Sequence, residues 1–473
     1  MSHPRRRQIL AAAGGAALGA ALPFASGTAA TASSRAAVPS RAAAAYGGYA
    51  MAYFAESNQG LGNSYALHLA VSTDGLQWSA LNQNAPVATP TAGTKGLRDP
   101  FIQRKQDGTF VILATDLNGQ NWGETNQYIH LWNSTDLRSF TNYRRVKVHS
   151  STTTHAWAPE AFWDAGRGQY AIIYSAHNGT RDVIMVNYTT DFITVGEPQT
   201  YFDPGFGIID ADVVTGVGGM NYLYYKRGNE LYGARSASLA PGAFNSGTYT
   251  GPIAHGGTEA PILVKSLTSE TWYLWGDTYT PNGVFYAWRT NDLATGNWTP
   301  VDQRSYTQPL NSKHAGITPI TTTELNALKS RWGVPTWSRL KSYNYPDRFV
   351  RHSNHAARID SIPFDPYPDM QWRVVTGLAG SGVSFESVNY PGQYLRHSDF
   401  VVVLAQNTGT AQFAADATFV PEAGLADSAA VSYRSYNYPT RYLRHSDYLL
   451  RIDTVSAASS STDKQDATFL LTS

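Results

Sequence analysis

The sequence predicts an all-β protein in which a five-bladed β-propeller is followed by a β-trefoil. Three observations support this fold class. The chain has 41 Gly and 24 Pro among 473 residues, and aromatic residues make up 12% of it, a composition typical of short strands joined by turns. Strand-like segments recur about every 50–60 residues over residues 46–320, the length of a propeller blade. Three similar blocks then repeat within the last third of the chain.

Composition and charge exclude several classes of protein. The 36 Lys and Arg residues nearly balance the 35 Asp and Glu residues, which leaves a net charge of +1. Nucleic-acid binding depends on neutralising phosphates, so we expect no nucleic-acid partner. Charged residues make up only 15% of the chain, which argues against disorder. The absence of Cys excludes disulfides, thiolate metal sites and Cys nucleophiles.

The N-terminus has the features of an export signal. Arg5, Arg6 and Arg7 precede an apolar run over residues 11–22 that is too short for a membrane span of about 20 residues. The stretch Arg6–Leu10 resembles a twin-arginine signal, and an ordinary secretory signal is the alternative. We therefore expect residues 1–37 to hold the export signal and the start of a lead-in. Residues 38–45 would be a disordered lead-in, and the mature protein would be secreted, extracellular and free of the membrane.

Each of the five predicted blades opens with a short polar motif before its innermost strand. The motifs are Arg98-Asp99-Pro100, Trp157-Ala158-Pro159-Glu160, Ile209-Asp210-Ala211-Asp212, Glu259-Ala260-Pro261 and His314-Ala315-Gly316. Innermost strands begin near the propeller axis on one face, so these side chains should meet in one funnel. The fifth blade has only one strand here. We expect strands near residues 49–54 and 66–72 to complete it and to close the ring, which removes exposed edges.

Three carboxylates of this funnel are candidate catalytic residues: Asp99, Asp210 and Glu259. Cleavage of a glycosidic bond with inversion needs one carboxyl group that donates a proton and another that activates water, about 6.5–9.5 Å apart. A third carboxylate nearby would raise the pKa of the acid. The alternative is that the two Asp residues form turns and that Glu259 lies on the surface.

Four further residues are candidates for substrate binding: Trp157, Glu160, Asn178 and His314. Trp157 could stack on a sugar ring or pack between blades. Glu160 could bind hydroxyl groups or be structural. Asn178 ends a strand that should return to the funnel face, and His314 could line the axial channel. No Asp-rich calcium loop is present in the sequence.

These motifs resemble glycoside hydrolase family 43, whose members are five-bladed inverting enzymes that act on polymers containing arabinose and xylose. The resemblance implies that Asp99 is the general base, Asp210 the pKa-tuning carboxylate and Glu259 the general acid. Asp212 lies two residues after Asp210, so the choice between the two depends on the resemblance. The family also implies a possible structural Ca²⁺ or Na⁺ in the channel and no required cofactor.

The last third of the chain contains a threefold repeat after a linker at residues 321–336, in which residues 324–331 look helical. The three blocks cover residues 342–354, 387–399 and 435–447. Each contains an Asn-Tyr-Pro triplet and ends in an Arg-His-Ser triplet followed by Asn or Asp. Each repeat also ends in a similar short segment that contains an Asp. One repeat cannot bury its own apolar face, so the three should close around a common core over residues 337–473. The repeated His and Asp residues either satisfy buried backbone groups or form one polar pocket per lobe.

The three blocks resemble the arabinose-binding β-trefoil of carbohydrate-binding module family 42. The resemblance implies one arabinofuranose site per lobe, with Tyr side chains as apolar faces. The implied site residues are His352, Asp369, Asn389, Tyr394, His397, Asp416, Asn437, Tyr442, His445 and Asp466. The first lobe departs from the pattern: Phe349 replaces the Tyr, and Asn354 replaces the Asp after the Ser. We therefore expect it to be the weakest site.

Together the two resemblances imply a secreted, inverting exo-α-L-arabinofuranosidase that favours α-1,5 links. Its partner would be arabinan or arabinoxylan, and we expect a monomer. The alternatives are an endo-arabinanase or a β-xylosidase on the same fold, or a non-catalytic arabinan-binding lectin.

Overall fold

The computed structural model describes residues 45–473 except residues 57–63, 254, 281, 282 and 363. The predicted export signal and nearly all of the predicted lead-in lie outside the described residues. The described part of the chain is almost entirely β-structure, with three short α-helices. No helix in this part is both long enough and apolar enough to span a membrane.

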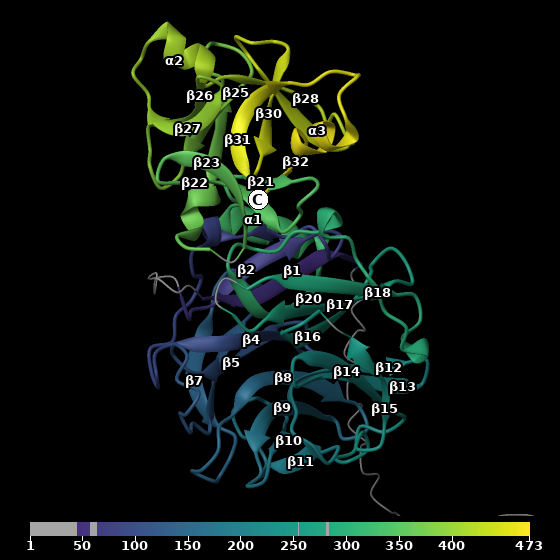
Figure 1. Ribbon diagram of the computed structural model, residues 1–473. Helices are drawn as coiled ribbons and strands as arrows, with labels where there is room; N and C mark the ends of the chain where they lie inside the picture. Colours follow the sequence, from purple (N-terminus) through teal and green to yellow (C-terminus); the bar gives the residue numbers. More distant parts are fainter. Residues whose placement is uncertain (1–44, 57–63, 254, 281–282, 363) are drawn as a thin grey trace, which may run out of the picture. The chain divides into compact units, whose positions relative to one another are not determined.

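Five four-stranded sheets form the blades of a propeller (Figure 1). The first two sheets along the chain are β4 (Leu97–Arg104), β5 (Phe110–Asp116), β6 (Tyr128–Ser134) and β7 (Thr141–Lys147), and then β8 (Trp157–Asp164), β9 (Gln169–His177), β10 (Asp182–Thr189) and β11 (Gln199–Phe202). The next two are β12 (Ile209–Val217), β13 (Met220–Arg227), β14 (Glu230–Ser236) and β15 (Thr248–Ile253), and then β16 (Thr258–Lys265), β17 (Trp272–Thr278), β18 (Phe285–Thr290) and β19 (Thr299–Pro300). The fifth joins β20 (Ser312–Thr321) to β1 (Tyr46–Ala55), β2 (His68–Ser72) and β3 (Ser79–Ala80).

The fifth blade closes the ring with strands from both ends of the propeller sequence. β1 pairs antiparallel with β20, with Met51 opposite Ile317 and Tyr49 opposite Pro319. The predictions of a five-bladed propeller and of a fifth blade completed by N-terminal strands are thus confirmed. Such closure leaves no inner strand without a partner.

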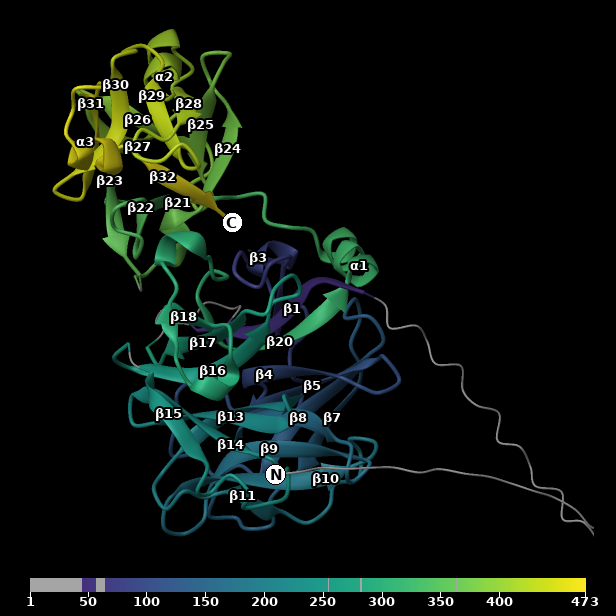
Figure 2. The same ribbon diagram turned by 90° about the vertical axis from the view of Figure 1, so that its right-hand side faces the viewer.

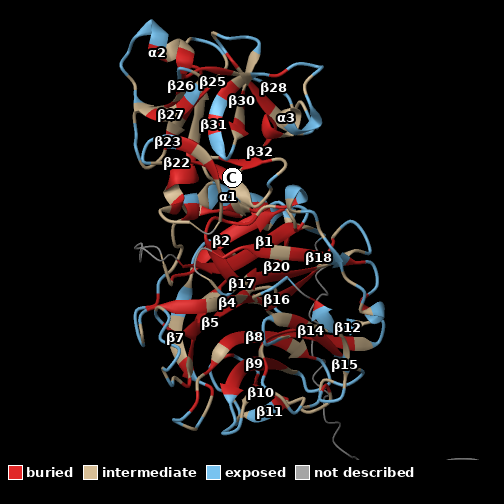
Figure 3. Cartoon of the chain, in the orientation of Figure 1, coloured by how far each residue is buried: buried red, intermediate tan, exposed pale blue. Residues whose placement is uncertain are grey.

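Apolar side chains between neighbouring blades form the propeller core. Much of the length of the propeller strands is buried (Figure 3). Five clusters of buried residues each combine strands from two adjacent blades. One of them, for example, packs Phe54 and Leu69 of the fifth blade against Phe110 and Ile112 of the first. Each such side chain contributes about 1.5–3 kcal/mol when fully buried, so every blade is held on both of its faces.

Helix α1 (Thr322–Trp332) follows the propeller, as its sequence predicts, and lies beside β1 and β20 (Figure 2). Thr321 and Glu324 form a reciprocal capping box at its start, and Gly333 follows its last residue. Leu325 and Leu328 are buried in the core cluster that also contains Phe54. These contacts fix the helix to the fifth blade.

The C-terminal region is a barrel-like twelve-stranded sheet. Its strands are β21 (Arg339–Ser342), β22 (Arg348–Ser353), β23 (Ala356–Ser361), β24 (Trp372–Thr376), β25 (Val383–Ser387), β26 (Gln393–Ser398), β27 (Val401–Gln406), β28 (Phe419–Ala423), β29 (Val431–Ser435), β30 (Arg441–Ser446), β31 (Leu449–Thr454) and β32 (Phe469–Thr472). The hairpins β22–β23, β26–β27 and β30–β31 repeat three times, and β23, β27 and β31 pair with one another. The three repeats surround one apolar core.

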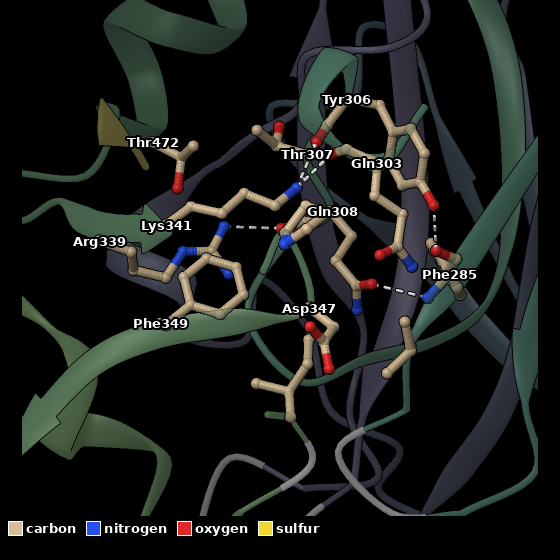
Figure 4. Close-up of a pocket in the computed structure, with 13 residues that line it drawn as sticks. Phe285, Gln303, Tyr306, Thr307, Gln308, Arg339, Lys341, Asp347, Phe349 and Thr472 are labelled. Atoms are coloured by element: carbon tan, nitrogen blue, oxygen red, sulfur yellow. Dashed lines mark hydrogen bonds between the residues drawn. The ribbon is translucent and has the colours of Figure 1, made fainter. Parts of the chain in front are cut away.

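A small pocket lies where β21 meets the propeller (Figure 4). Arg339 donates a hydrogen bond to the carbonyl oxygen of Gln308 at 2.8 Å, and the Lys341 ammonium group donates to the carbonyl oxygens of Gln303 and Tyr306. Its volume of about 20 Å³ is room for one water molecule rather than a sugar. It contains none of the predicted site residues.

Candidate active site

The inner strands of the propeller open into one cavity of about 410 Å³. All five blades contribute to its lining, which consists of Arg98, Asp99, Leu117, Trp122, Trp157, Ile209, Asp210, Lys226, Asn229, Glu259, Tyr279 and His314. Five of the seven predicted site residues of the propeller are among them, including all three candidate catalytic carboxylates. The funnel expected from the blade motifs is therefore present.

A repeated backbone irregularity aims these side chains. Asp99, Ala158, Asp210 and Ala260 all have a left-handed φ of 49–55°, and the strand register shifts at each of these sites. A bulge of this kind bends the strand and turns the side chains beside it toward the axis. Non-glycine residues in this conformation store strain, which is typical of functional sites.

The bulges show that the three candidate catalytic carboxylates do not all occupy the same position in their blades. Asp99 and Asp210 occupy the left-handed position, whereas Glu259 lies one residue earlier, in the position of Arg98 and Trp157. The three carboxylates are thus not equivalent in successive blades. The equivalent of Asp99 in the fourth blade is Ala260.

Side chains from one blade hold the bulge of the next. The backbone N–H of Ala158 donates to Thr115 Oγ1 at 2.8 Å, and the N–H of Asp210 donates to Ser175 Oγ at 3.0 Å. The N–H of His314 donates to Asp277 Oδ2 at 3.0 Å. These acceptors all lie on the second strand of the preceding blade, so the position of each inner strand depends on its neighbour.

Asp99 is held as a carboxylate by His314. His314 Nδ1 lies 3.1 Å from Asp99 Oδ1, and Thr115 donates to Asp99 Oδ2 at 2.7 Å. Burial opposes the charge of Asp99, but His314, Arg98 and Thr115 lower its pKa to about 2. Burial likewise opposes the charge of His314, but Asp99 and the neighbouring carboxylates raise its pKa to about 9. An ionised Asp99 can accept a proton from water.

Glu259 lies between two lysines. Lys226 Nζ is 2.7 Å from Glu259 Oε2, and Lys313 Nζ is 3.6 Å from Glu259 Oε1. Burial raises the pKa of Glu259, but Lys313 and Lys226 outweigh it, so the net pKa lies below its ordinary value. These two ammonium groups therefore favour the anionic form of Glu259.

Asp210 and Asp212 lie in different surroundings, which distinguishes their roles. Asp210 lines the cavity, and burial, supported by the charges of Glu259 and Asp99 and opposed by His314, raises its pKa to about 6. Asp212 does not line the cavity and accepts the backbone N–H of Leu263. Of the two, Asp210 has the position expected for a carboxylate that tunes its neighbours.

Two of the predicted substrate-binding residues lie outside the cavity. Glu160 is buried two residues past the bulge, beside Asp212, and burial together with this neighbour raises its pKa well above the ordinary value. Asn178 is exposed, and its side-chain oxygen accepts the backbone N–H groups of Thr180 and Arg181, which fixes a turn. The strand that ends near Asn178 does return to the funnel face, but Asn178 is not among the residues that line the cavity.

Several cavity residues were not found from the sequence. Trp122 and Tyr279 are 50% and 54% exposed, and the Trp122 ring meets the Trp157 ring edge-on at 6.0 Å. Arg98 stacks on Trp122 at 4.6 Å and pairs with Glu56 at 2.8 Å. Trp122 and Tyr279 both follow second strands, so the connections at the funnel end of each blade were the signal that could have revealed them.

The barrel brings its repeated polar residues together between repeats. His352 Nε2 lies 3.0 Å from Asn389 Oδ1, and Asn389 Nδ2 donates to Asp369 Oδ1 at 2.8 Å. The same arrangement recurs in two more clusters, His397 with Asn437 and Asp416, and His445 with Asn344 and Asp466. Asn344 was missed in the sequence, although it occupies the Asn position of the first block. The Asp residues are placed by the short helices η4 (Tyr367–Met370), α2 (Ala411–Asp416) and α3 (Ser461–Asp466).

The Tyr of each Asn-Tyr-Pro triplet places its ring beside the His of one cluster. Tyr390, Tyr438 and Tyr345, from the Asn-Tyr-Pro triplets, lie 5.2, 5.3 and 5.5 Å from the rings of His352, His397 and His445. They are 39–46% exposed. Tyr442 instead donates a hydrogen bond to Glu422, and Tyr394 makes no ring contact with these His residues. The triplet itself was the signal that could have identified the exposed rings.

Phe349 and Asn354, in which the first lobe departs from the sequence pattern, are not part of its His, Asn and Asp cluster. Phe349 is buried at the junction with the propeller, where Arg339 stacks on it. Asn354 has a φ of 49°, and the equivalent Asp399 and Asp447 have 48° and 50°, so all three serve the same turn. The first lobe therefore has the same polar geometry as the other two.

The described residues show no metal site in the propeller or in the barrel. Within the described ranges, no group of three or more His, Asp or Glu side chains is arranged to hold an ion. The channel Ca²⁺ or Na⁺ implied by the family thus finds no matching ligand set there, and it stays a prediction.

A five-bladed propeller whose inner strands bring acidic side chains to one open cavity is typical of glycoside hydrolases. Residues 44–326 match the family model described as a probable glycosyl hydrolase domain, and residues 338–471 match the alpha-L-arabinofuranosidase B domain. The first match covers more than half of the chain, so the protein belongs to this glycosyl hydrolase family. Both resemblances inferred from the sequence are confirmed.

Curated relatives match parts of the chain. An alpha-L-arabinofuranosidase of Bifidobacterium longum is 28% identical over 224 residues, 41% of this chain and 21% of the relative. An extracellular exo-alpha-(1->5)-L-arabinofuranosidase of Streptomyces avermitilis is 55% identical over 145 residues, 29% of each chain. Alpha-L-arabinofuranosidase B of Aspergillus kawachii is 41% identical over 92 residues, 18% of each chain. The matched part is thus less than a third of each of these relatives.

Proposed function

We propose that this glycoside hydrolase is a secreted α-L-arabinofuranosidase that releases terminal arabinofuranose from arabinan and arabino-oligosaccharides, with exo-cleavage of α-1,5 links. The observation that carries the proposal is the cavity in which Asp99, Asp210 and Glu259 meet in three different electrostatic settings. The names of the relatives support the substrate class and the exo-1,5 preference. The name of the Streptomyces relative also supports an extracellular location.

The proposed mechanism is a single displacement with inversion and no cofactor. Asp99, held ionised by His314, takes a proton from the attacking water. Glu259 gives a proton to the leaving oxygen on the other side of the sugar. Asp210 lines the same cavity. Its negative charge disfavours ionisation of Glu259, and its side chain holds the sugar in place.

The barrel is proposed to be an arabinose-binding β-trefoil with one site per repeat. Each site would use the His, Asn and Asp cluster for hydroxyl groups and the exposed Tyr of the Asn-Tyr-Pro triplet for the sugar face. The support is the threefold pairing of its hairpins and the match to the alpha-L-arabinofuranosidase B domain. The partner polysaccharide would be arabinan or arabinoxylan, bound by a monomer.

Product analysis tests this function. Linear and debranched arabinan are incubated with the wild type and with Glu259→Gln, which should lower the rate by about 10²–10⁴-fold. Arabinose as the sole early product supports exo action. Early oligosaccharides would indicate an endo-arabinanase, release of xylose from xylo-oligosaccharides a β-xylosidase, and binding without any product a lectin.

The stereochemistry is tested by NMR of fresh digests. Inversion at an α-linked substrate gives β-arabinofuranose first, before mutarotation. If α-arabinofuranose is formed first, the reaction passes through a covalent intermediate and the proposed roles of Asp99 and Glu259 are wrong.

A further inference from the structure

Lys226 differs from the other cationic side chains of the cavity. Arg98 is paired with Glu56 at 2.8 Å, and His314 with Asp99 at 3.1 Å. Lys226 lies near the end of β13, opposite Ile209 in the inner strand. Among the described residues, its one ion pair is with the proposed acid, Glu259, at 2.7 Å. Both side chains of this pair are 15% exposed, toward the cavity.

The second lysine near Glu259 is bound elsewhere. Lys313 is fully buried, lies 3.0 Å from Asp277 Oδ2, and donates a hydrogen bond to the carbonyl oxygen of Thr278. Its distance to Glu259 is longer, 3.6 Å. Lys313 is therefore a fixed counterion of Asp277, and it is not among the residues that line the cavity.

The charges around Glu259 conflict with its proposed role. The groups that face it are Lys226 from β13, Lys313 and His314 from β20, Arg98 and Asp99 from β4, Asp210 from β12 and Asp277 from β17. The cations outweigh the carboxylates, so Glu259 is ionised in the empty cavity. An ionised carboxylate has no proton for the leaving oxygen, so some contact must change when substrate binds.

Lys226 is the contact that can change. Its ammonium group carries three donors on a flexible stem, and it already faces the space that a sugar would fill. We propose that Lys226 is a substrate-binding residue whose ammonium group leaves Glu259 for a hydroxyl oxygen of the bound sugar, so that Glu259 becomes protonated only in the occupied cavity. This inference rests on the proposed function.

The proton count balances over one cycle. Glu259 takes one proton from solvent when the sugar displaces Lys226 and excludes water, since both changes favour the neutral acid. This proton passes to the glycosidic oxygen as its bond to the sugar breaks. The oxygen of the attacking water forms the new bond to the anomeric carbon and gives one proton to Asp99, which releases it to solvent. When the product leaves, Lys226 returns to Glu259.

The pH dependence of the two kinetic parameters tests the inference. The profile of kcat/KM reports groups of the free enzyme, and that of kcat reports groups of the substrate complex. With an arabino-oligosaccharide, the alkaline limb of wild-type kcat should lie at least about one pH unit above that of kcat/KM. Lys226→Met should move the kcat/KM limb up toward the kcat limb and raise KM about tenfold, because one sugar contact is lost.

Lys265→Met is the matched control. Lys265 pairs with Glu270 at the same distance of 2.7 Å, but on the surface, where Glu270 is 90% exposed. This variant should leave both limbs and KM unchanged. Lys226→Gln is measured in parallel, and thermal unfolding shows which variants are folded; if Lys226→Met does not fold, Lys226→Gln decides.

The outcomes separate this inference from the proposed function. If the wild type releases arabinose but its two alkaline limbs coincide, or if the Lys226 variants leave the kcat/KM limb in place, Lys226 is only a structural counterion and the inference is wrong. If the wild type releases no arabinose from any arabino-oligosaccharide, the proposed function itself fails.

Discussion

Asp99 and His314 each owe their charge to the other. Asp99 is acidified by an imidazolium 3.1 Å away, and that imidazolium exists at neutral pH because carboxylates surround it. Removing either partner takes away the nearest opposite charge of the other, which is buried. The pair thus couples the proposed general base to the strand that closes the ring.

His314→Gln should move the acid limb of kcat/KM to higher pH. Without the imidazolium, burial raises the pKa of Asp99 from about 2 toward or above its ordinary value, so a larger share of the base is protonated below neutrality. We expect a shift of at least about one pH unit. A limb that stays in place would show that Asp99 does not limit the rate on the acid side.

The same pair makes a pH-dependent contribution to stability. The folded pKa of His314 is raised, so its contribution is complete below about 6.5 and disappears as the pH rises through about 9. The folded pKa of Asp99 is lowered, so its contribution holds above about 4 and disappears as the pH falls toward 2. The stability difference between wild type and His314→Gln, measured in urea, should therefore be largest between about pH 4 and 6.5. A difference that does not vary between pH 5 and 9 would contradict the ion pair.

Asp210→Asn separates its electrostatic effect from its structural one. Asp210 raises the proton affinity of Glu259 by like-charge repulsion, so its neutral replacement should move the alkaline limb of kcat to lower pH. Asn keeps the shape of the side chain and the backbone bond to Ser175. Circular dichroism and thermal unfolding are the control for the fold, and an unchanged limb in a folded variant would exclude the tuning role.

At the scale of the elements, features that repeat along the sequence could be predicted, whereas local backbone conformation could not. The order of the blades, the closing strands and the helix after the propeller followed from recurring strands, turns and caps. The left-handed bulges did not, because Asp and Ala residues have no sequence mark for positive φ. The sequence therefore did not reveal that Glu259 lies one position before the residue equivalent to Asp99, or that Glu160 and Asn178 do not line the cavity.

In the barrel, the sequence predicted which polar residues meet but not which ring lies beside them. The His and Asp residues repeat at fixed intervals, and the structure brings them together. The Tyr of the Asn-Tyr-Pro triplet repeats in all three blocks, whereas the position near Arg-His-Ser holds Tyr394, Tyr442 and, in the first block, Phe349, so the more regular repeat belongs to the triplet. Burial separates the two positions in the first lobe, where Tyr390 is 46% exposed and Phe349 5% exposed, while Tyr394 and Tyr442 of the other lobes are half-buried.

Phe349→Ala and Tyr390→Ala should therefore have opposite effects. Phe349 fills the junction with the propeller, so its loss should destabilise the protein by about 3–5 kcal/mol with little effect on sugar binding. Tyr390→Ala should leave stability within about 0.5 kcal/mol and weaken the first-lobe site. Denaturant unfolding and titration with arabino-oligosaccharides measure the two effects. If folded Phe349→Ala lost sugar binding, Phe349 would belong to the first-lobe sugar site.

At the scale of the whole molecule, the proposed cleavage site and the proposed polymer-binding sites lie in different sheets. The cavity is built only from propeller strands, and the three polar clusters only from the barrel. A single furanose buries little area, so each barrel site should bind weakly. Three sites on one polymer chain can raise retention by about 10²–10⁴-fold through rebinding.

Replacing His352, His397 and His445 together by Ala should abolish retention on insoluble arabinan. Each single replacement should cause a similar partial loss, including His352→Ala, since all three clusters have the same polar geometry. Cleavage of a soluble arabinotriose, which needs only the propeller cavity, should be almost unchanged in the triple variant. Pull-down with insoluble arabinan and the rate of arabinose release measure the two properties on one preparation. A folded triple variant that still binds arabinan normally would mean that the repeated His residues serve the fold of the barrel rather than its sugar sites.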